Sequence, residues 1–165
     1  MKVIDILNNT DKPVFSFELV PPLKGGDINK IYEAIEPLIA LAPPFINITF
    51  HRDEVVYREY PDGTIKKVTV TKRPGSVALA AAIMRRYNVD MVPHIVCGGA
   101  TRHKIENELI DLNFLDIENV MALRGDPIPG ERFFTPEEGG HRYSCELVEQ
   151  ITRMNHGQYL DDTLT

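Results

Sequence analysis

The chain has 165 residues, of which 43% are hydrophobic and 25% charged, and its formal net charge is -6 at pH 7. This length suits one domain with a substantial core and is too short for two domains of ordinary size. The negative charge, with basic residues scattered along the sequence, argues against a nucleic-acid surface, and no apolar run is long enough to span a bilayer. We therefore expect one domain over residues 1–165 in a soluble, cytoplasmic protein.

The first half of the chain predicts helices and strands in alternation, followed by a β-hairpin. Residues 14–20 are rich in β-branched and aromatic side chains and stop at Pro21, which predicts a strand whose end lies near Glu18. A second strand at 45–50 follows an amphipathic helix that starts after Asp27, its expected N-cap. The other elements are a short helix within residues 1–12 and a solvent-exposed hairpin of segments 54–60 and 64–71 around a Pro-Asp-Gly turn.

The second half continues the alternation. A helix at 76–87 is expected to be capped by Ser76, with Arg85 and Arg86 favourably near its negative end. Residues 120–123 form a short, continuous apolar run, which is typical of a strand covered on both faces. The other predicted elements are a strand at 91–97, a helix at about 102–114, a Pro- and Gly-rich loop at 128–140 and a final helix at 143–154.

The predicted order is one helix followed by four β-then-α units, which gives an α/β fold with a parallel sheet and helices outside it. Four such units are half of a (β/α)8 barrel of the TIM type, here with the hairpin inserted after the second strand. A small open, doubly wound sheet is the alternative. The chain has no GxGxxG after its first or fourth strand and no P-loop pattern, which argues against a nucleotide-binding Rossmann unit.

Each predicted strand ends in polar side chains. They are Glu18, Thr49 with His51, His94 with Cys97, and Arg124 with Asp126. Ligands bind at the carboxyl ends of parallel strands, so four such groups on one rim predict a site. Glu18 in an apolar mouth would have a raised pKa and could deliver a proton near neutrality, although it could instead pair with a neighbouring Arg or Lys. Arg124 and Asp126 could simply be a pair that closes a loop.

The remaining candidates have structural alternatives too. Thr49 can bond a ligand or cap the next segment, and His94, inside an apolar strand, fits a core histidine. Cys97 fits a buried, inert thiol. Because Cys97 and Cys145 have no metal-ligand spacing, we expect reduced thiols and no metal site. Acid-assisted redox or lyase chemistry with a bound cofactor is the class of reaction that stays open.

Four segments match, in order and spacing, the strand motifs of one enzyme family. They are Phe15-Ser-Phe-Glu18 with Pro21-Pro22, Asn47-Ile-Thr49-Phe, Pro93-His94-Ile-Val-Cys97, and the most specific of them, Asn119-Val-Met-Ala-Leu-Arg-Gly-Asp-Pro127. Together they resemble the methylenetetrahydrofolate reductase family. The resemblance implies an FAD-containing (β/α)8 barrel in which NAD(P)H reduces the flavin, and the reduced flavin passes hydride to 5,10-methylenetetrahydrofolate to form 5-methyltetrahydrofolate.

The resemblance also implies roles for individual residues. Glu18 resembles the family's general acid, which assists opening of the five-membered ring of the folate. Asp126 resembles an aspartate beside the flavin that contacts the pterin and opposes the charge of the reduced flavin. Thr49 resembles a threonine near the nicotinamide and the flavin. The other positions that match FAD contacts are Phe50, His94, Arg124, Gly125, Tyr143 and Ser144.

The chain departs from the family in two ways. The common Thr-Tyr-Gly-Ala pattern reads Thr49-Phe50-His51-Arg52 here, which leaves the flavin contact beyond Phe50 open, and the inserted hairpin is placed to cover that edge. The chain also corresponds to only the first half of the family's barrel, without strands five to eight and their FAD and folate contacts. Its first and fourth strands are then open edges, which should pair with something or aggregate.

This half-barrel has three explanations: a truncated sequence, a half that assembles with a second chain or copy, or a stable non-catalytic remnant. We expect a folate-binding reductase that works as a homo-oligomer or together with a missing carboxyl-terminal half, without nucleic-acid or membrane partners. A non-catalytic interaction module that retains the motifs by descent is the alternative.

Overall fold

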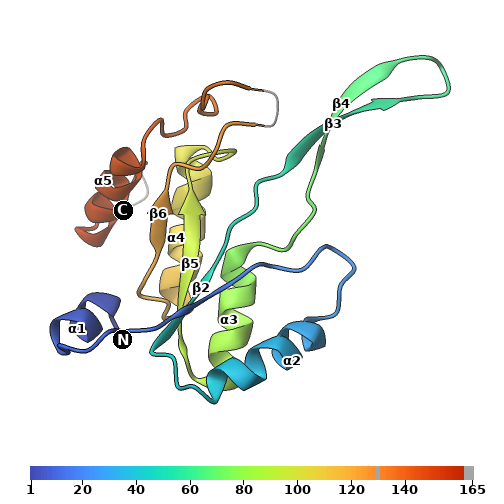
Figure 1. Cartoon of the computed structure of the whole chain (residues 1–165). Coiled ribbons are helices and arrows are strands. Elements are labelled where there is room, and N and C mark those ends of the chain that lie inside the picture. The colour runs from blue at the N-terminus through green and yellow to red at the C-terminus, as the bar shows by residue number, and fades with distance from the viewer. Residues whose placement is uncertain (129–130, 162–165) are drawn as a thin grey trace.

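A computed structural model describes residues 1–128 and 131–161 of the chain (Figure 1). The helices are α1 (Val3–Asn8), α2 (Ile28–Ile39), α3 (Ser76–Tyr87), α4 (Arg102–Phe114) and α5 (Ser144–Asn155). The strands are β1 (Phe17–Leu19), β2 (Phe45–Ile48), β3 (Glu54–Glu59), β4 (Ile65–Val70), β5 (Asp90–Val96) and β6 (Met121–Leu123). This order confirms the predicted helix and four β-then-α units. Within the described ranges, no helix is long and apolar enough to cross a membrane.

Strands β1, β2, β5 and β6 form one parallel sheet in that spatial order. Glu18 is in register with Asn47, Asn47 with Val92, and His94 with Met121. The sheet and its alternating helices have the arrangement of a partial TIM-type barrel. Among the described strands the barrel is not closed, and β1 and β6 are its two edges.

The core lies between this sheet and the helices. Ile46 and Ile48 of β2 and Ile95 of β5 are fully buried and pack in one cluster with the helices. The helical members of this cluster include Ile35 of α2, Ile83 of α3, Ile105 of α4 and Leu147 of α5, all with no exposed surface. Burial of one such side chain stabilises the fold by about 2 kcal/mol. These contacts hold four helices on one face of the sheet.

Alternate residues of the same strands point to the opposite face, which we call the inner face. Glu18, Asn47, Val92, His94 and Met121 lie on it. In a closed barrel the inner face would line the interior. Here no second layer of described strands packs against it, and the side chain of Glu18 is 55% exposed.

The hairpin of β3 and β4 projects beyond the parallel sheet (Figure 1). At its turn, the carboxylate of Asp62 accepts hydrogen bonds from the backbone N–H and the hydroxyl of Thr64 (3.0 and 2.6 Å). At its base, the N–H of Lys24 donates to the carbonyl of Lys72 (2.7 Å). The predicted hairpin is therefore confirmed, and it points away from the parallel sheet (Figure 1).

Two local predictions were wrong. Gly75, not Ser76, is the N-cap of α3; Ser76 is the first helical residue, and its hydroxyl donates to the carbonyl of His94 (3.3 Å). Strand β1 is also shorter than residues 14–20, because its pairing with β2 begins only at Phe17. The loop predicted at 128–140 contains no helix or strand where it is described, and residues 129–130 lie outside the described residues.

Candidate active site

The end of β6 and the start of α5 border a cavity of about 480 Å³. Its lining is Leu123, Arg124, Gly125, Asp126, Tyr143 and Ser144. The last five of these are residues for which the sequence predicted a cofactor site. They meet because α5 packs on β6 through the buried side chain of Leu147, which returns the start of the helix to the end of the strand. We call these five residues the rim cluster.

The two charged members of the rim cluster do not close the loop as a pair. Among the described residues, Arg124 bonds through Nε to the carbonyl of Gly125 (3.4 Å), and its guanidinium lies 5.4 Å from the ring centre of Phe134. Asp126 is exposed, and no described residue forms an ion pair with it. Both charges are therefore available to a ligand.

Gly125 is required by the backbone at this point. Its φ angle is +86°, in the left-handed region that L side chains rarely adopt, and an added Cβ would lie 2.6 Å from Cγ1 of Val96. The strand end therefore approaches β5 more closely than any side chain at residue 125 would permit. Such a bare stretch of backbone is what close contact with a flat or phosphorylated ligand needs.

Hydrogen bonds extend the parallel ladder past the strand ends and hold the rim in place. Each is a backbone bond from an N–H to a carbonyl. The N–H of Thr49 donates to Leu19 (3.0 Å), that of Cys97 to Leu123 (3.0 Å), and that of Gly98 to Arg124 (3.1 Å). These bonds fix the end of β1 to that of β2 and the end of β5 to that of β6, and the pairing of β2 with β5 joins the two halves.

Glu18 and His94 meet on the inner face, across β2. Oε2 of Glu18 lies 3.5 Å from Nε2 of His94, whose side chain is 7% exposed. This Nε2 is buried and has no hydrogen-bond partner among the described residues. The predicted apolar mouth around Glu18 is not formed, because one side of this carboxylate faces solvent. The predicted proximity of strand-end groups is nevertheless real for this pair.

Burial lowers the pKa of His94 below its ordinary value of 6.5, and the nearby carboxylate of Glu18 acts in the opposite direction without cancelling the shift. The imidazole is therefore neutral at neutral pH, and its contact with Glu18 is not a full ion pair. A neutral ring can accept or donate a hydrogen bond at Nε2, depending on its tautomer.

Thr49 has a structural role that the sequence left open. Its hydroxyl donates to the carbonyl of Leu19 (3.3 Å) and lies 3.5 Å from Nδ1 of His51. Phe50 beside it is half-buried. Burial, and then the positive charge of Arg73, lower the pKa of His51. Thr49 and Phe50 thus lie at the end of β2, but they do not line the cavity of the rim cluster.

Neither thiol lines the cavity of the rim cluster, although Sγ of Cys97 donates to the carbonyl of Tyr143 (3.7 Å). Cys97 is fully buried, and burial raises the pKa of its thiol, as expected for an inert structural cysteine. Cys145 is exposed and free. Within the described part of the chain, no group of three or more His, Cys, Asp or Glu side chains is placed to hold a metal ion.

Sequence reasoning missed two groups of polar residues. Asn47 is only 7% exposed on the inner face, and its Oδ1 has no hydrogen-bond partner among the described residues. Its signals were the strand alternation that places it beside Glu18 and its position at the start of the Asn47-Ile-Thr49-Phe motif.

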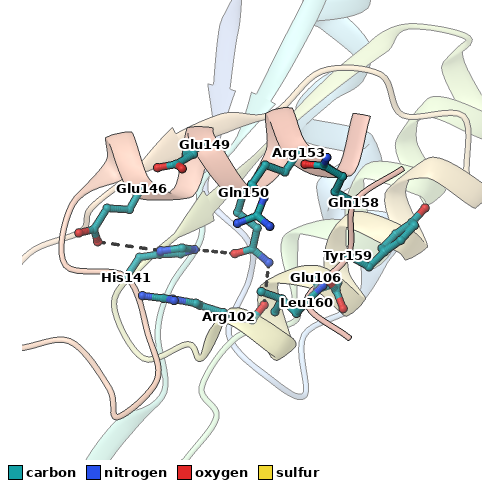
Figure 2. Close-up of a pocket in the computed structure, with 10 residues that line it drawn as sticks. All are labelled: Arg102, Glu106, His141, Glu146, Glu149, Gln150, Arg153, Gln158, Tyr159 and Leu160. Atoms are coloured by element: carbon teal, nitrogen blue, oxygen red, sulfur yellow. Dashed lines mark hydrogen bonds and ion pairs between the residues drawn. The ribbon is translucent and has the colours of Figure 1, made fainter. Parts of the chain in front are cut away.

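The second missed group is a polar network between α4 and α5. Figure 2 shows His141 between Glu146 and Gln150. Nε2 of His141 lies 2.5 Å from Oε1 of Gln150. The amide Nε2 of Gln150 donates to the carbonyl of Arg102 (3.0 Å). The carboxylate of Glu146 accepts from the N–H of Tyr143 (3.2 Å). This network positions the start of α5, and with it the second half of the rim cluster.

The family model described as methylenetetrahydrofolate reductase matches residues 2–164 of the chain. The chain belongs to this family. Methylenetetrahydrofolate reductase (NADH) 1 of Arabidopsis thaliana is 28% identical over 167 residues, which cover 99% of this chain and 25% of that protein. Methylenetetrahydrofolate reductase 1 of Schizosaccharomyces pombe is 28% identical over 155 residues, or 92% and 23% of the two chains.

A bacterial relative gives the same picture. The 5,10-methylenetetrahydrofolate reductase of Pectobacterium carotovorum is 24% identical over 138 residues, which cover 82% of this chain and 38% of that protein. This chain therefore spans about a quarter of the plant and yeast members of the methylenetetrahydrofolate reductase family and less than half of the bacterial one.

Replacing Gly125 with alanine should destabilise the chain through two separate effects. The left-handed backbone costs an alanine about 1–2 kcal/mol, and the contact with Val96 adds about 1–3 kcal/mol of overpacking. Urea unfolding of Gly125→Ala, Val96→Ala and the double variant measures both. The double variant should be more stable than the sum of the single changes predicts.

Gly139→Ala is the matched control, because its φ angle is +73° and no atom lies within 4 Å of the added Cβ. It should show the backbone cost alone. Equal losses at both glycines, with additive behaviour of the Val96 pair, would contradict the close approach of the strand end.

As the pH falls, the free energy of unfolding of the chain should decrease, partly because of His94. Because the folded state lowers its pKa, the unfolded chain binds a proton first as the pH falls through 6.5, and the free energy of unfolding decreases until the lowered pKa is passed. One such group contributes a slope of at most about 1.4 kcal/mol per pH unit. His94→Gln should flatten the profile between pH 7 and 5 in urea titrations.

His103→Gln, at an exposed position on α4, serves as the control and should keep the original slope. His51 also has a lowered pKa and contributes equally to all three proteins. A His94→Gln profile that coincides with that of the unchanged chain would show that His94 is not the group responsible.

Proposed function

We propose that this chain carries the flavin-binding and proton-transfer part of a reductase that converts 5,10-methylenetetrahydrofolate to 5-methyltetrahydrofolate with NAD(P)H as the electron donor. The observation that carries the proposal is the rim cluster, in which five residues at positions that the resemblance implies for the cofactor line one cavity at the carboxyl end of a parallel sheet. Family membership supports the same substrate class.

The residues of the rim cluster fit FAD. Gly125 leaves room for close approach along bare backbone, and the N-terminus of the twelve-residue helix α5, at Tyr143 and Ser144, favours negative charge. Arg124 supplies a cation that no described carboxylate neutralises. Thr49, Phe50 and His94 approach the same rim from β2 and β5. Bound FAD would supply the hydride-transfer chemistry; the protein supplies binding, orientation and charge.

Glu18 and His94 handle the proton in this proposal. The carboxyl group of Glu18 is open to the inner face and can reach a ligand there, while His94 holds it from the other side at 3.5 Å. Burial keeps the imidazole neutral, so Nε2 can accept a hydrogen bond from the protonated carboxyl group of Glu18, which a charged ring could not do. Protonation of the folate by Glu18 assists opening of its five-membered ring.

Asp126 completes the arrangement with a negative charge. Its exposed carboxylate lies in the rim cluster beside Arg124, where it opposes accumulation of further negative charge on a bound ligand and offers an acceptor to the pterin. The four strands described here form one half of an eight-stranded site, and turnover is proposed for the completed barrel. The alternative is an assembly module that keeps these residues without catalysis.

Titration with FAD tests the proposal. The purified chain should take up FAD with a visible flavin absorption band, and Arg124→Met should weaken binding about tenfold or more through the loss of a charged contact. Arg132→Met is a matched control, because Arg132 also lies over a phenylalanine ring, at 5.3 Å from Phe133, but does not line the cavity of the rim cluster. A protein that retains no flavin after incubation with saturating FAD and removal of the excess favours the assembly module.

Glu18→Gln separates proton transfer from flavin reduction. In the completed barrel, loss of the general acid should lower folate reduction by about a hundredfold or more, while oxidation of NAD(P)H by an artificial electron acceptor stays at its original rate. Glu33→Gln, on the exposed face of α2, should leave both rates unchanged. Equal loss of both rates in Glu18→Gln would overturn the assignment of Glu18 as the general acid.

A further inference from the structure

The two halves of the rim cluster come from distant parts of the chain. Asp126 follows β6 and Tyr143 precedes α5, and the segment between them contains no helix or strand where it is described. Leu147 packs α5 on the sheet through apolar contact, which has no preferred direction. Hydrogen bonds, which are directional, must therefore set how far the start of α5 lies from the end of β6.

The start of α4 is a fixed reference for the chain that leads into α5. The N–H of Arg102, the first residue of α4, donates to the carbonyl of Gly139 (3.1 Å). An added Cβ at Gly140 would lie 2.7 Å from the carbonyl oxygen of Ala100, so the two segments meet as bare backbone. Ala100 lies in the turn that joins β5 to α4. The path of the chain into His141 is therefore tied to β5, which is paired with β6.

His141 ends this path with a buried imidazole between α4 and α5 (Figure 2), and the residue is only 4% exposed. Its Nε2 lies 2.5 Å from Oε1 of Gln150, and the amide nitrogen of Gln150 donates to the carbonyl of Arg102. A carbonyl only accepts hydrogen bonds, so this second contact turns the amide nitrogen of Gln150 towards Arg102 and its oxygen towards the imidazole. Nε2 of His141 therefore carries a proton and is the donor in the bond to Gln150.

The other side of the imidazole faces Glu146. Nδ1 of His141 lies 3.9 Å from Oε2 of Glu146 and has no hydrogen-bond partner among the described residues. The same oxygen accepts from the N–H of Arg142 (2.6 Å) and from that of Tyr143 (3.2 Å), and these two bonds lower the pKa of Glu146. The ring thus has one directed bond, at Nε2, and packs against the carboxylate that caps the start of α5.

We propose that His141 is a positioning residue of the rim cluster. Its bond from Nε2 to Gln150 sets where the start of α5 lies relative to the end of β6, and so where Tyr143 lies relative to Asp126. His141 does not line the cavity of the rim cluster, so it acts through the start of α5 and touches no ligand there. The inference rests on the proposed function in one respect, because FAD is the ligand expected to sense this placement.

Nitrogen NMR of the histidine rings in the unchanged chain tests the bond directly. The signals of His141 are identified as those that His141→Gln removes. Its ring should show a proton on Nε2. A ring whose Nε2 is bare would exclude the bond to Gln150 and with it the proposal, and this measurement needs no flavin.

Two substitutions at His141 separate the roles of its ring nitrogens. The amide nitrogen of a glutamine can occupy the place of Nε2 and donate to Gln150, whereas that of the shorter asparagine occupies the place of Nδ1 and faces Glu146. His141→Asn should therefore speed hydrogen exchange of the Tyr143 N–H about tenfold or more, because the start of α5 opens more often. His141→Gln should leave this exchange slow.

His156→Gln is the matched control. His156 also bonds α5 through one ring nitrogen, to the carbonyl of Thr152 (2.7 Å), but at the end of the helix away from the rim cluster. Its replacement should leave exchange of the Tyr143 N–H unchanged. Equal exchange in His141→Gln and His141→Asn, or faster exchange in His141→Gln, would show that the bond from Nε2 does not set the placement.

A paired replacement separates placement from stability. His141→Phe alone leaves Oε1 of Gln150 buried without a donor, whereas His141→Phe with Gln150→Leu removes both polar groups and should regain most of the lost stability in urea unfolding. The paired variant should nevertheless bind FAD about tenfold more weakly than the unchanged chain. A paired variant with full stability and unchanged FAD affinity would reduce His141 to a structural role. An unchanged chain that takes up no FAD counts against the proposed function, while the NMR and exchange measurements still decide the role of His141.

Discussion

The parallel hydrogen-bond ladder from β1 through β2 and β5 to β6 is the constraint on which the rest of the molecule depends. It fixes the register of four short strands, two of which have only three residues, and it continues past their ends to Thr49, Cys97 and Gly98. Because all four strands run in the same direction, their polar terminal residues are delivered to one side. The buried isoleucine cluster holds the ladder to its helices but does not select which residues meet at the rim.

Much of this arrangement could be predicted from the sequence, because the apolar runs and their breakers are local signals. Their positions at the ends of predicted parallel strands placed Glu18 and His94 on one rim, and the structure brings Oε2 of Glu18 to 3.5 Å from Nε2 of His94. The surroundings of Glu18 could not be predicted in the same way. An apolar mouth needs side chains from other strands, and none of the described strands lies on the free side of β1.

Other features depended on tertiary contacts that no local pattern encodes. Tyr143 and Ser144 reach the end of β6 only because α5 packs back on that strand, and they were predicted by resemblance alone. The cap of α3 was assigned to Ser76 because serine is a common N-cap. In the structure Ser76 is the first helical residue, its hydroxyl donates to the carbonyl of His94, and Gly75 takes the cap position instead.

The hairpin of β3 and β4 has a consequence for how the chain can be handled. A backbone hydrogen bond from Lys24 to Lys72 fixes its base, while its tip at Asp62 and Gly63 is exposed to solvent. Doubling the length of a flexible loop costs only about 0.6 kcal/mol. Residues 62–63 are therefore a natural attachment point for a fluorophore, an affinity tag or a fused domain, whereas the same insertion after β6 would separate Asp126 from Tyr143.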